Sequence, residues 1–183
     1  MQDMPSPQDQ SPIAAAAAAG KPAIDPQALR QALGQFPTGV AVVTTVAPDG
    51  RPVGLTINSF AALSLDPPLV LWSLMNRSPS LAAFSACSHF VVHVLAAGQT
   101  TLARQFASAG LPDKFAGIDW QPGPGGAPLL AGALAQFICR PHRQDESGDH
   151  TLFIGRVDGL HQQSGEPGEP AVFHRGRFAA LAG

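Results

Sequence analysis

The stretch "GLTINSFAALSLDPPLV", from Gly54 to Val70, sets polar residues between two apolar runs. It predicts one strand, a turn, and a second strand that begins near the double proline. Side chains alternate along a strand, so Thr56 and Asn58 would share one face, and a bend at Ser59 would add its hydroxyl. Such a cluster suits the edge of a planar heterocycle rich in acceptors. A polar strand end whose side chains hydrogen-bond to the adjacent loop explains these polar residues equally well.

The segments on either side of this stretch carry clear signals for helices and strands. Asp25 and Pro26 suit the start of a helix over 25–36. The turn Pro48-Asp49-Gly50 predicts a hairpin between strands near 40–47 and 51–58. The apolar run "PLVLWSLM" at 68–75 predicts a buried strand. Ser78 and Pro79 then predict the N-cap and first residue of a short helix over 78–87.

The rest of the chain is rich in predicted strands and poor in long helices. We expect strands at 89–96, 129–144, 149–163 and 170–181, a helix at 98–109, and a loop with at most one helical turn over 113–128. The two long strands would be joined through Glu146, Ser147 and Gly148. This order predicts a mainly β fold with short helices, built as a closed antiparallel barrel. Strands and long helices do not alternate, which argues against a parallel Rossmann sheet.

Composition narrows the class of protein. The 183 residues suffice for one domain with a real core, which we place at 25–183 after a disordered Ala- and Pro-rich tail at 1–24. A net charge of −2 with only 11 scattered Lys and Arg argues against nucleic-acid binding. No apolar run reaches the ~20 residues that span a bilayer. Cys87 and Cys139 are expected to be free thiols, and the protein cytoplasmic.

Two further segments carry residue types that can bind anions or metals. Arg77, at the predicted start of a helix, could bind an anion with its guanidinium and the helix N–H groups. The alternative is a plain capped helix with an exposed arginine. His89 and His93 lie four apart on a strand, without the Glu of a zinc-protease helix, so we predict no metal site.

In order and spacing, six segments resemble the flavin reductase-like family, the FMN-binding split-barrel proteins. They are "FPTGVAVVTT" (36–45), "GLTINSFAALSLDPPLV" (54–70), "NRSPS" (76–80), "DKFAG" (113–117), "GDHTLFIGRV" (148–157) and "PAVFHRGRF" (170–178). The resemblance implies a split antiparallel β-barrel that works as a homodimer, with flavin at the subunit interface. Many relatives end with a tyrosine. This chain has none, and Phe173, His174 and Phe178 occupy that segment.

The resemblance also implies roles for individual residues. His150 would lie beside the flavin ring where the nicotinamide stacks, although a structural turn residue is the alternative. Phe106 and Lys114 would line the outer part of the site. The remaining flavin contacts would come from three groups: Pro37, Thr38 and Gly39 near the ring or ribityl chain; Thr56, Asn58, Ser59 and Phe60 at the ring edge and ribityl oxygens; Ser73, Asn76, Arg77 and Ser78 at the phosphate.

The implied activity is NAD(P)H:flavin oxidoreduction. Hydride would pass from NADH or NADPH to FMN or FAD, and the reduced flavin would supply a partner flavin-dependent monooxygenase. The chemistry needs two stacked rings rather than a nucleophile. The alternatives are a flavoprotein that retains its FMN and reduces another acceptor, an FMN-binding electron carrier with no nicotinamide site, and a barrel that binds a heterocycle without turnover. The sequence does not choose between FMN and FAD, or between NADH and NADPH.

Overall fold

The computed structural model describes residues 24–165 and 168–181, so nearly all of the predicted tail at 1–24 lies outside the described residues. The chain divides into one unit that ends at Gln35 and a second that runs from Phe36 to Gly183. In the first unit the described part forms helix α2 (Pro26–Leu33). The Asp25 carboxylate accepts hydrogen bonds from the backbone N–H groups of Gln27 and Ala28, at 3.2 and 3.1 Å. This confirms the predicted cap.

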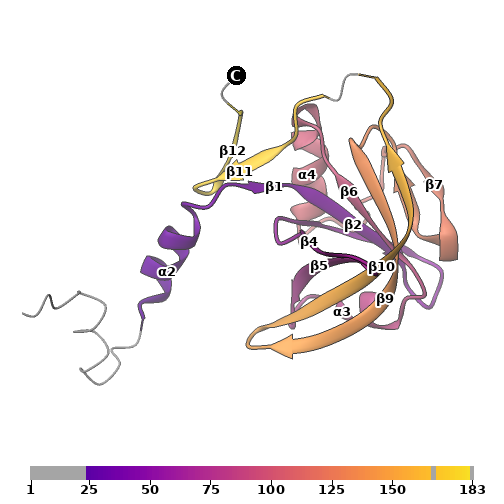
Figure 1. The fold of residues 1–183 in the computed structure, drawn as a ribbon, viewed down its shortest axis with the longest axis horizontal. Helices are drawn as coiled ribbons and strands as arrows, with labels where there is room; N and C mark the ends of the chain where they lie inside the picture. Colours follow the sequence, from indigo (N-terminus) through magenta and orange to yellow (C-terminus); the bar gives the residue numbers. More distant parts are fainter. Residues whose placement is uncertain (1–23, 166–167, 182–183) are drawn as a thin grey trace, which may run out of the picture. The chain divides into compact units, whose positions relative to one another are not determined.

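The second unit is built on a seven-stranded sheet whose ladders are all antiparallel. In spatial order its strands are β3 (Pro52–Ile57), β2 (Ala41–Val46), β6 (Phe90–Val94), β9 (Ala135–Ser147), β10 (His150–Gln162), β5 (Pro68–Met75) and β4 (Ala61–Leu65). The mainly β, antiparallel prediction is confirmed. The order is linear, with β3 and β4 at its ends, so the strand pairing of the described residues does not form the closed ring that we expected. Figure 1 shows β9 and β10 as a long curved hairpin.

The opening stretch contains one more strand than the sequence predicted. After β3, the chain bends through residues 58–60 and forms β4, which pairs with β5. We expected a turn there. Four of the five β4 residues are exposed, so this edge strand has no alternation of buried and exposed positions to reveal it.

Smaller elements complete the second unit. Strand β1 (Thr38–Gly39) joins β11 (Val172–His174) and β12 (Arg177–Ala179) in a three-stranded sheet. The predicted loop at 113–128 contains strand β7 (Trp120–Pro122) and turn η2 (Pro124–Gly126), and β7 pairs with β8 (Pro128–Leu130). Turn η1 (Ala97–Gln99) leads into helix α4 (Thr100–Ala107). No helix in the described ranges has the length and hydropathy needed to cross a membrane.

Helix α3 (Leu81–Ala86) begins two residues later than the sequence predicted. The Ser78 hydroxyl accepts a hydrogen bond from the N–H of Ser80 at 3.3 Å, and the Ser78 carbonyl accepts one from Leu81 at 3.1 Å. Ser78 therefore caps a turn that precedes the helix, and Ser80 occupies the N-cap position. The short-range hydrogen bonds of serine explain the shift, because they compete with helix formation.

Aromatic packing holds the main core together. Trp72 on β5 stacks on Phe153 of β10, with ring centroids 4.5 Å apart and planes 10° apart. Phe84 of α3 and Phe90 of β6 meet the same indole edge-on, at 5.0 and 5.8 Å. All four side chains are buried. This cluster fixes β5, β10 and α3 against one another, and these elements carry part of the site described below.

His93 is a buried histidine that joins three strands. The N–H of Leu130 donates to its Nε2 at 3.1 Å, so Nδ1 carries the proton and donates to the Val42 carbonyl at 3.0 Å. The histidine thus lies in a strand, as predicted. Cys87 and Cys139 are free thiols, also as predicted. Burial lowers the pKa of His93 from 6.5 to about 4, because a charged imidazole loses its hydration there.

His93 therefore predicts acid sensitivity of the fold. The unfolded chain takes up a proton near pH 6.5, but the folded chain does so only near pH 4. The free energy of unfolding should fall by about 1.4 kcal/mol per pH unit as pH drops through this window, and this contribution should be constant above it. Urea titrations of the parent and of His93→Gln, which retains a donor and an acceptor, measure it. Equal pH slopes in the two proteins would contradict the assignment.

Candidate functional site

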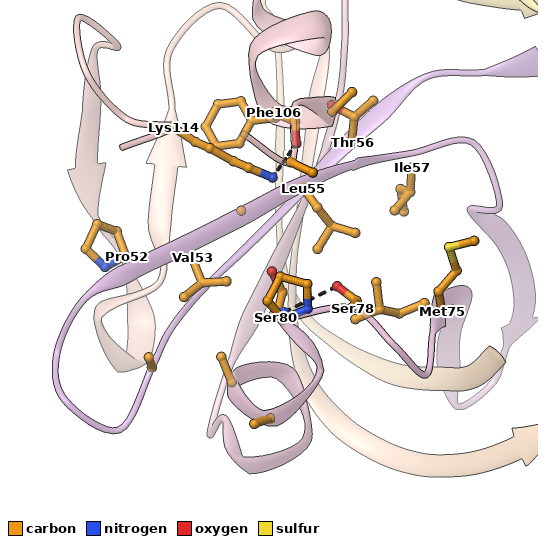
Figure 2. Close-up of a pocket in the computed structure, with 18 of the residues that line it drawn as sticks. Pro52, Val53, Leu55, Thr56, Ile57, Met75, Ser78, Ser80, Phe106 and Lys114 are labelled. Atoms are coloured by element: carbon orange, nitrogen blue, oxygen red, sulfur yellow. Dashed lines mark hydrogen bonds between the residues drawn. The ribbon is translucent and has the colours of Figure 1, made fainter. Parts of the chain in front are cut away.

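A cavity of about 1250 Å³ runs along β3 in the second unit. Figure 2 shows residues of β3, among them Val53, Leu55 and Thr56, with Ser78 and Ser80 on one side and Phe106 and Lys114 on the other. Its size exceeds the ~300–1000 Å³ of a cleft for one drug-sized ligand. The cavity therefore has room for more than one small molecule.

The cavity unites residues that the sequence predicted from separate segments. They come from β3 and the bend after it, from the end of β5 and the following turn, from α4 and its loop, and from the start of β10. The predicted site residues that line it are Thr56, Asn58, Ser59, Ser73, Arg77, Ser78, Phe106, Lys114 and His150.

The polar residues of the opening stretch are held in different ways. The Thr56 hydroxyl donates to the Ala103 carbonyl of α4 at 2.6 Å. The Ser59 hydroxyl accepts from the N–H of Ser73 at 3.0 Å and donates to its carbonyl at 3.3 Å. Both hydroxyl protons are thus used within the protein. The Asn58 side chain is exposed and makes no hydrogen bond within the described part of the chain, so its amide can both donate to and accept from a ligand.

Two of the predicted site residues, Lys114 and Arg77, are cations that line the cavity in different environments. Lys114 donates from Nζ to the Phe106 carbonyl at 2.8 Å, and partial burial lowers the pKa of its ammonium group. Arg77 is exposed, and its guanidinium makes no hydrogen bond to the other described residues. Arg77 therefore offers its whole donor fork to an anion.

His150 is the first residue of β10, opposite Met75 of β5 and Ser147 of β9. Its Nδ1 lies 2.7 Å from Oδ1 of Asp149, and its side chain is 40% exposed. The hydrogen bond from His150 is the main cause that lowers the pKa of the Asp149 carboxyl group, and the charge of Arg77 contributes. With Nδ1 held by Asp149, Nε2 remains for a molecule in the cavity.

The other predicted residues do not line the cavity. Thr38 and Gly39 pair with β11, and Thr38 Oγ1 is buried without a hydrogen-bond partner in the described residues. Phe60 packs on Phe137, with ring centroids 5.3 Å apart. Asn76 bonds to the β9–β10 turn. Pro37 precedes β1. Their predicted flavin contacts stay predictions.

Sequence reasoning missed the outer rim of the cavity. The β2–β3 turn contributes Asp49 and Arg51, which pair at 2.7 Å, and the loop after α4 contributes Leu111 and Pro112. The predicted hairpin could have indicated Asp49 and Arg51, because its turn must directly precede β3. The loop carries no comparable local signal.

Comparison with known proteins identifies the class. The model of the flavin reductase like domain matches residues 33–182, and the chain belongs to this family. It is 43% identical over 156 residues to an NADH-dependent FMN reductase of Agrobacterium fabrum, covering 85% of this chain and 86% of that protein. It is 45% identical over 159 residues to the reductase subunit of a flavin-dependent monooxygenase of Rhodococcus jostii, covering 87% and 80%.

Solved structures agree with this assignment. Nitrilotriacetate monooxygenase component B from Mycobacterium thermoresistibile matches with a TM-score of 0.82 and 43% identity, over 87% of this chain and 88% of that one. An NADH:FAD oxidoreductase of Streptomyces globisporus, in complex with NAD and FAD fragments, matches with a TM-score of 0.80 and 41% identity, over 88% and 97%.

Gly54 provides a test of how tightly the cavity wall is packed. A Cβ at Gly54 would lie 2.5 and 2.8 Å from two ring carbons of Phe106, whose side chain is fully buried. Gly54→Ala should therefore lower the free energy of unfolding by roughly 1–3 kcal/mol through overpacking. Gly98→Ala, where an added Cβ meets nothing within 4 Å, is the control in urea titrations. Equal stability of the two variants would show that Phe106 moves freely.

Proposed function

We propose that this protein is an NAD(P)H-dependent flavin reductase that takes hydride from NADH or NADPH, passes it to FMN or FAD, and supplies reduced flavin to a partner monooxygenase. The observation that carries the proposal is the cavity along β3, where Asn58, Arg77 and His150 offer free or partly free polar groups. The family assignment and the printed activities of the relatives support it.

The cavity residues fit a flavin mononucleotide unit. Asn58 can meet the acceptors and donors at a ring edge, and Arg77 can bind a phosphate with its free guanidinium. Thr56 and Ser59 keep only acceptor capacity, because their protons are used by Ala103 and Ser73. A volume of about 1250 Å³ leaves space for a nicotinamide ring beside the flavin.

A bound flavin would supply the hydride-accepting chemistry, so the protein's task is to place two rings and exclude competing reactions. His150 can bind or orient the nicotinamide through Nε2, since Asp149 holds Nδ1. Phe106 and Phe115, which are buried and whose rings meet edge-on at 5.0 Å, form an apolar part of the cavity wall. No nucleophile is required of the chain.

We also propose the split-barrel homodimer that the family resemblance implies. Strand β4 ends the sheet and pairs on one side only among the described residues, and its Leu63 and Leu65 are 46% and 95% exposed. Apolar side chains on an unpaired edge strand are normally covered. Sedimentation velocity should give a dimer for the parent, and a monomer at all concentrations would contradict this part of the proposal.

The proposed activity is tested by following the nicotinamide absorbance band with NADH or NADPH, each mixed with FMN or FAD. Oxidation that requires added flavin and saturates with it is expected, and the four mixtures identify the preferred pair. A yellow protein that keeps FMN and oxidises no nicotinamide would instead favour the electron carrier.

Arg77→Ala should weaken flavin binding. Loss of a charge-assisted contact to phosphate costs roughly 1.5–3 kcal/mol, or about a 10- to 150-fold rise in Kd. Fluorescence titration with FMN measures it. Arg143→Ala is the matched control, because Arg143 pairs with Asp145 outside the cavity. An unchanged Kd for Arg77→Ala, or an equal loss in the control, would refute the phosphate contact.

His150→Ala should slow NAD(P)H oxidation about tenfold at saturating flavin, equivalent to about 1.4 kcal/mol of transition-state stabilisation. Its FMN affinity should stay within a factor of two to three, because the imidazole is assigned to the nicotinamide. His142→Ala removes an exposed imidazole from β9 and is the control. Equal rates for His150→Ala and the parent would contradict a catalytic role and leave His150 as a structural turn residue.

A further inference from the structure

Asn76 follows β5 directly and makes four hydrogen bonds to the hairpin that carries His150. Its backbone N–H donates to the Asp149 carbonyl at 2.9 Å. Its side-chain Nδ2 donates to Glu146 Oε1 at 3.2 Å and to the Gly148 carbonyl at 3.3 Å. Its Oδ1 accepts from the Thr151 hydroxyl at 2.8 Å. The partners lie before, within and after the β9–β10 turn.

These bonds leave Asn76 little capacity for a ligand. Both Nδ2 protons have acceptors and Oδ1 has a donor, so only one lone pair of the amide oxygen is unused. An amide that binds phosphate must donate a proton to it. Asn76 also does not line the cavity, whereas its neighbours Met75 and Arg77 do.

The turn that Asn76 holds determines where His150 lies. Gly148 has a φ of +63°, which favours glycine, and residues 148 and 149 connect Ser147 to its strand partner His150. The Asp149 carboxylate contacts Nδ1 of His150, and the Asp149 carbonyl accepts a hydrogen bond from the backbone N–H of Asn76. A shift of the turn would therefore move the imidazole relative to the cavity.

We propose that Asn76 is a positioning residue that clamps the β9–β10 turn and so sets the location of His150 at the cavity, in place of the phosphate contact that the family resemblance implied. The inference rests on the role proposed above for His150. The same residue precedes Arg77, so one amide joins the turn that carries His150 to the segment proposed to bind the flavin phosphate.

The test combines a spectroscopic signal with kinetics. The ring Cε1–Hε1 resonance of His150, assigned by its loss in His150→Ala, reports the imidazole environment without turnover. Asn76→Ala should shift this resonance, lower turnover at saturating flavin at least fivefold, and leave the FMN Kd within twofold. The double variant Asn76→Ala/His150→Ala should be no slower than His150→Ala alone, because both changes act through one group.

Matched variants guard against general damage to the fold. Gln144→Ala removes a β9 side chain whose one hydrogen bond within the described residues goes to the Ser85 carbonyl, and it should leave the resonance and turnover unchanged. Thr151→Val removes the donor to Asn76 Oδ1 and should produce a smaller shift in the same resonance, while Thr151→Ser keeps the donor and should not. The Thr151 pair decides the question if Asn76→Ala does not fold.

Two results would overturn the clamp. An unshifted His150 resonance in Asn76→Ala with a tenfold or greater rise in FMN Kd would restore the phosphate contact. An unshifted resonance in both Asn76→Ala and Thr151→Val would remove any link between the amide and the imidazole. If His150→Ala turns over normally, the proposed role of His150 fails, and the resonance still decides whether Asn76 positions it.

Discussion

The pairing of β10 with β5 is the constraint on which the site depends. Residues 150–156 of β10 lie opposite residues 75–69 of β5, while the same strand pairs with β9 on its other side. This register sets His150 opposite Met75, beside the turn that contains Arg77. Stacking of Trp72 on Phe153, which are direct partners in the ladder, fixes it, because a slip of one residue would place the two rings on opposite faces of the sheet.

The site also depends on polar side chains of β3 and of the bend after it that are already hydrogen-bonded within the protein before a ligand binds. Thr56 and Ser59 use their hydroxyl protons on Ala103 and Ser73, which ties β3 to α4 and the bend after β3 to β5. These bonds give the cavity its shape, and Asn58, Arg77 and His150 remain for ligands. In the opening stretch, two hydroxyls used within the protein thus flank the Asn58 amide, which we propose for ligand binding.

Local sequence signals predicted much of this arrangement. The apolar run at 68–75 and the Pro48-Asp49-Gly50 turn identified β5 and the β2–β3 hairpin, because period, proline and glycine act over a few residues. Strand β4 was missed, since an exposed edge has no buried face to impose a pattern. The start of α3 was predicted two residues too early, because the Ser78 hydroxyl caps the turn that precedes the helix.

The site illustrates the limit of such reasoning. Nine of the fourteen predicted site residues line the cavity, but their assembly was predicted from the family resemblance as much as from the residues themselves. Asn76 shows why: its partners Glu146, Gly148 and Thr151 lie 70, 72 and 75 positions away in the sequence. Hydrogen bonds over such separations leave no periodic pattern in the sequence. A residue that a motif assigns to phosphate binding can therefore stabilise a distant turn instead.

A crystal structure of the protein with FMN bound would show directly whether the cavity along β3 holds the flavin. We expect the isoalloxazine ring beside β3, within hydrogen-bond distance of Asn58, and the phosphate at Arg77. His150 should then lie at the open face of the ring. Flavin density elsewhere on the chain, or a phosphate remote from Arg77, would contradict the assignment of the cavity along β3 as the flavin site.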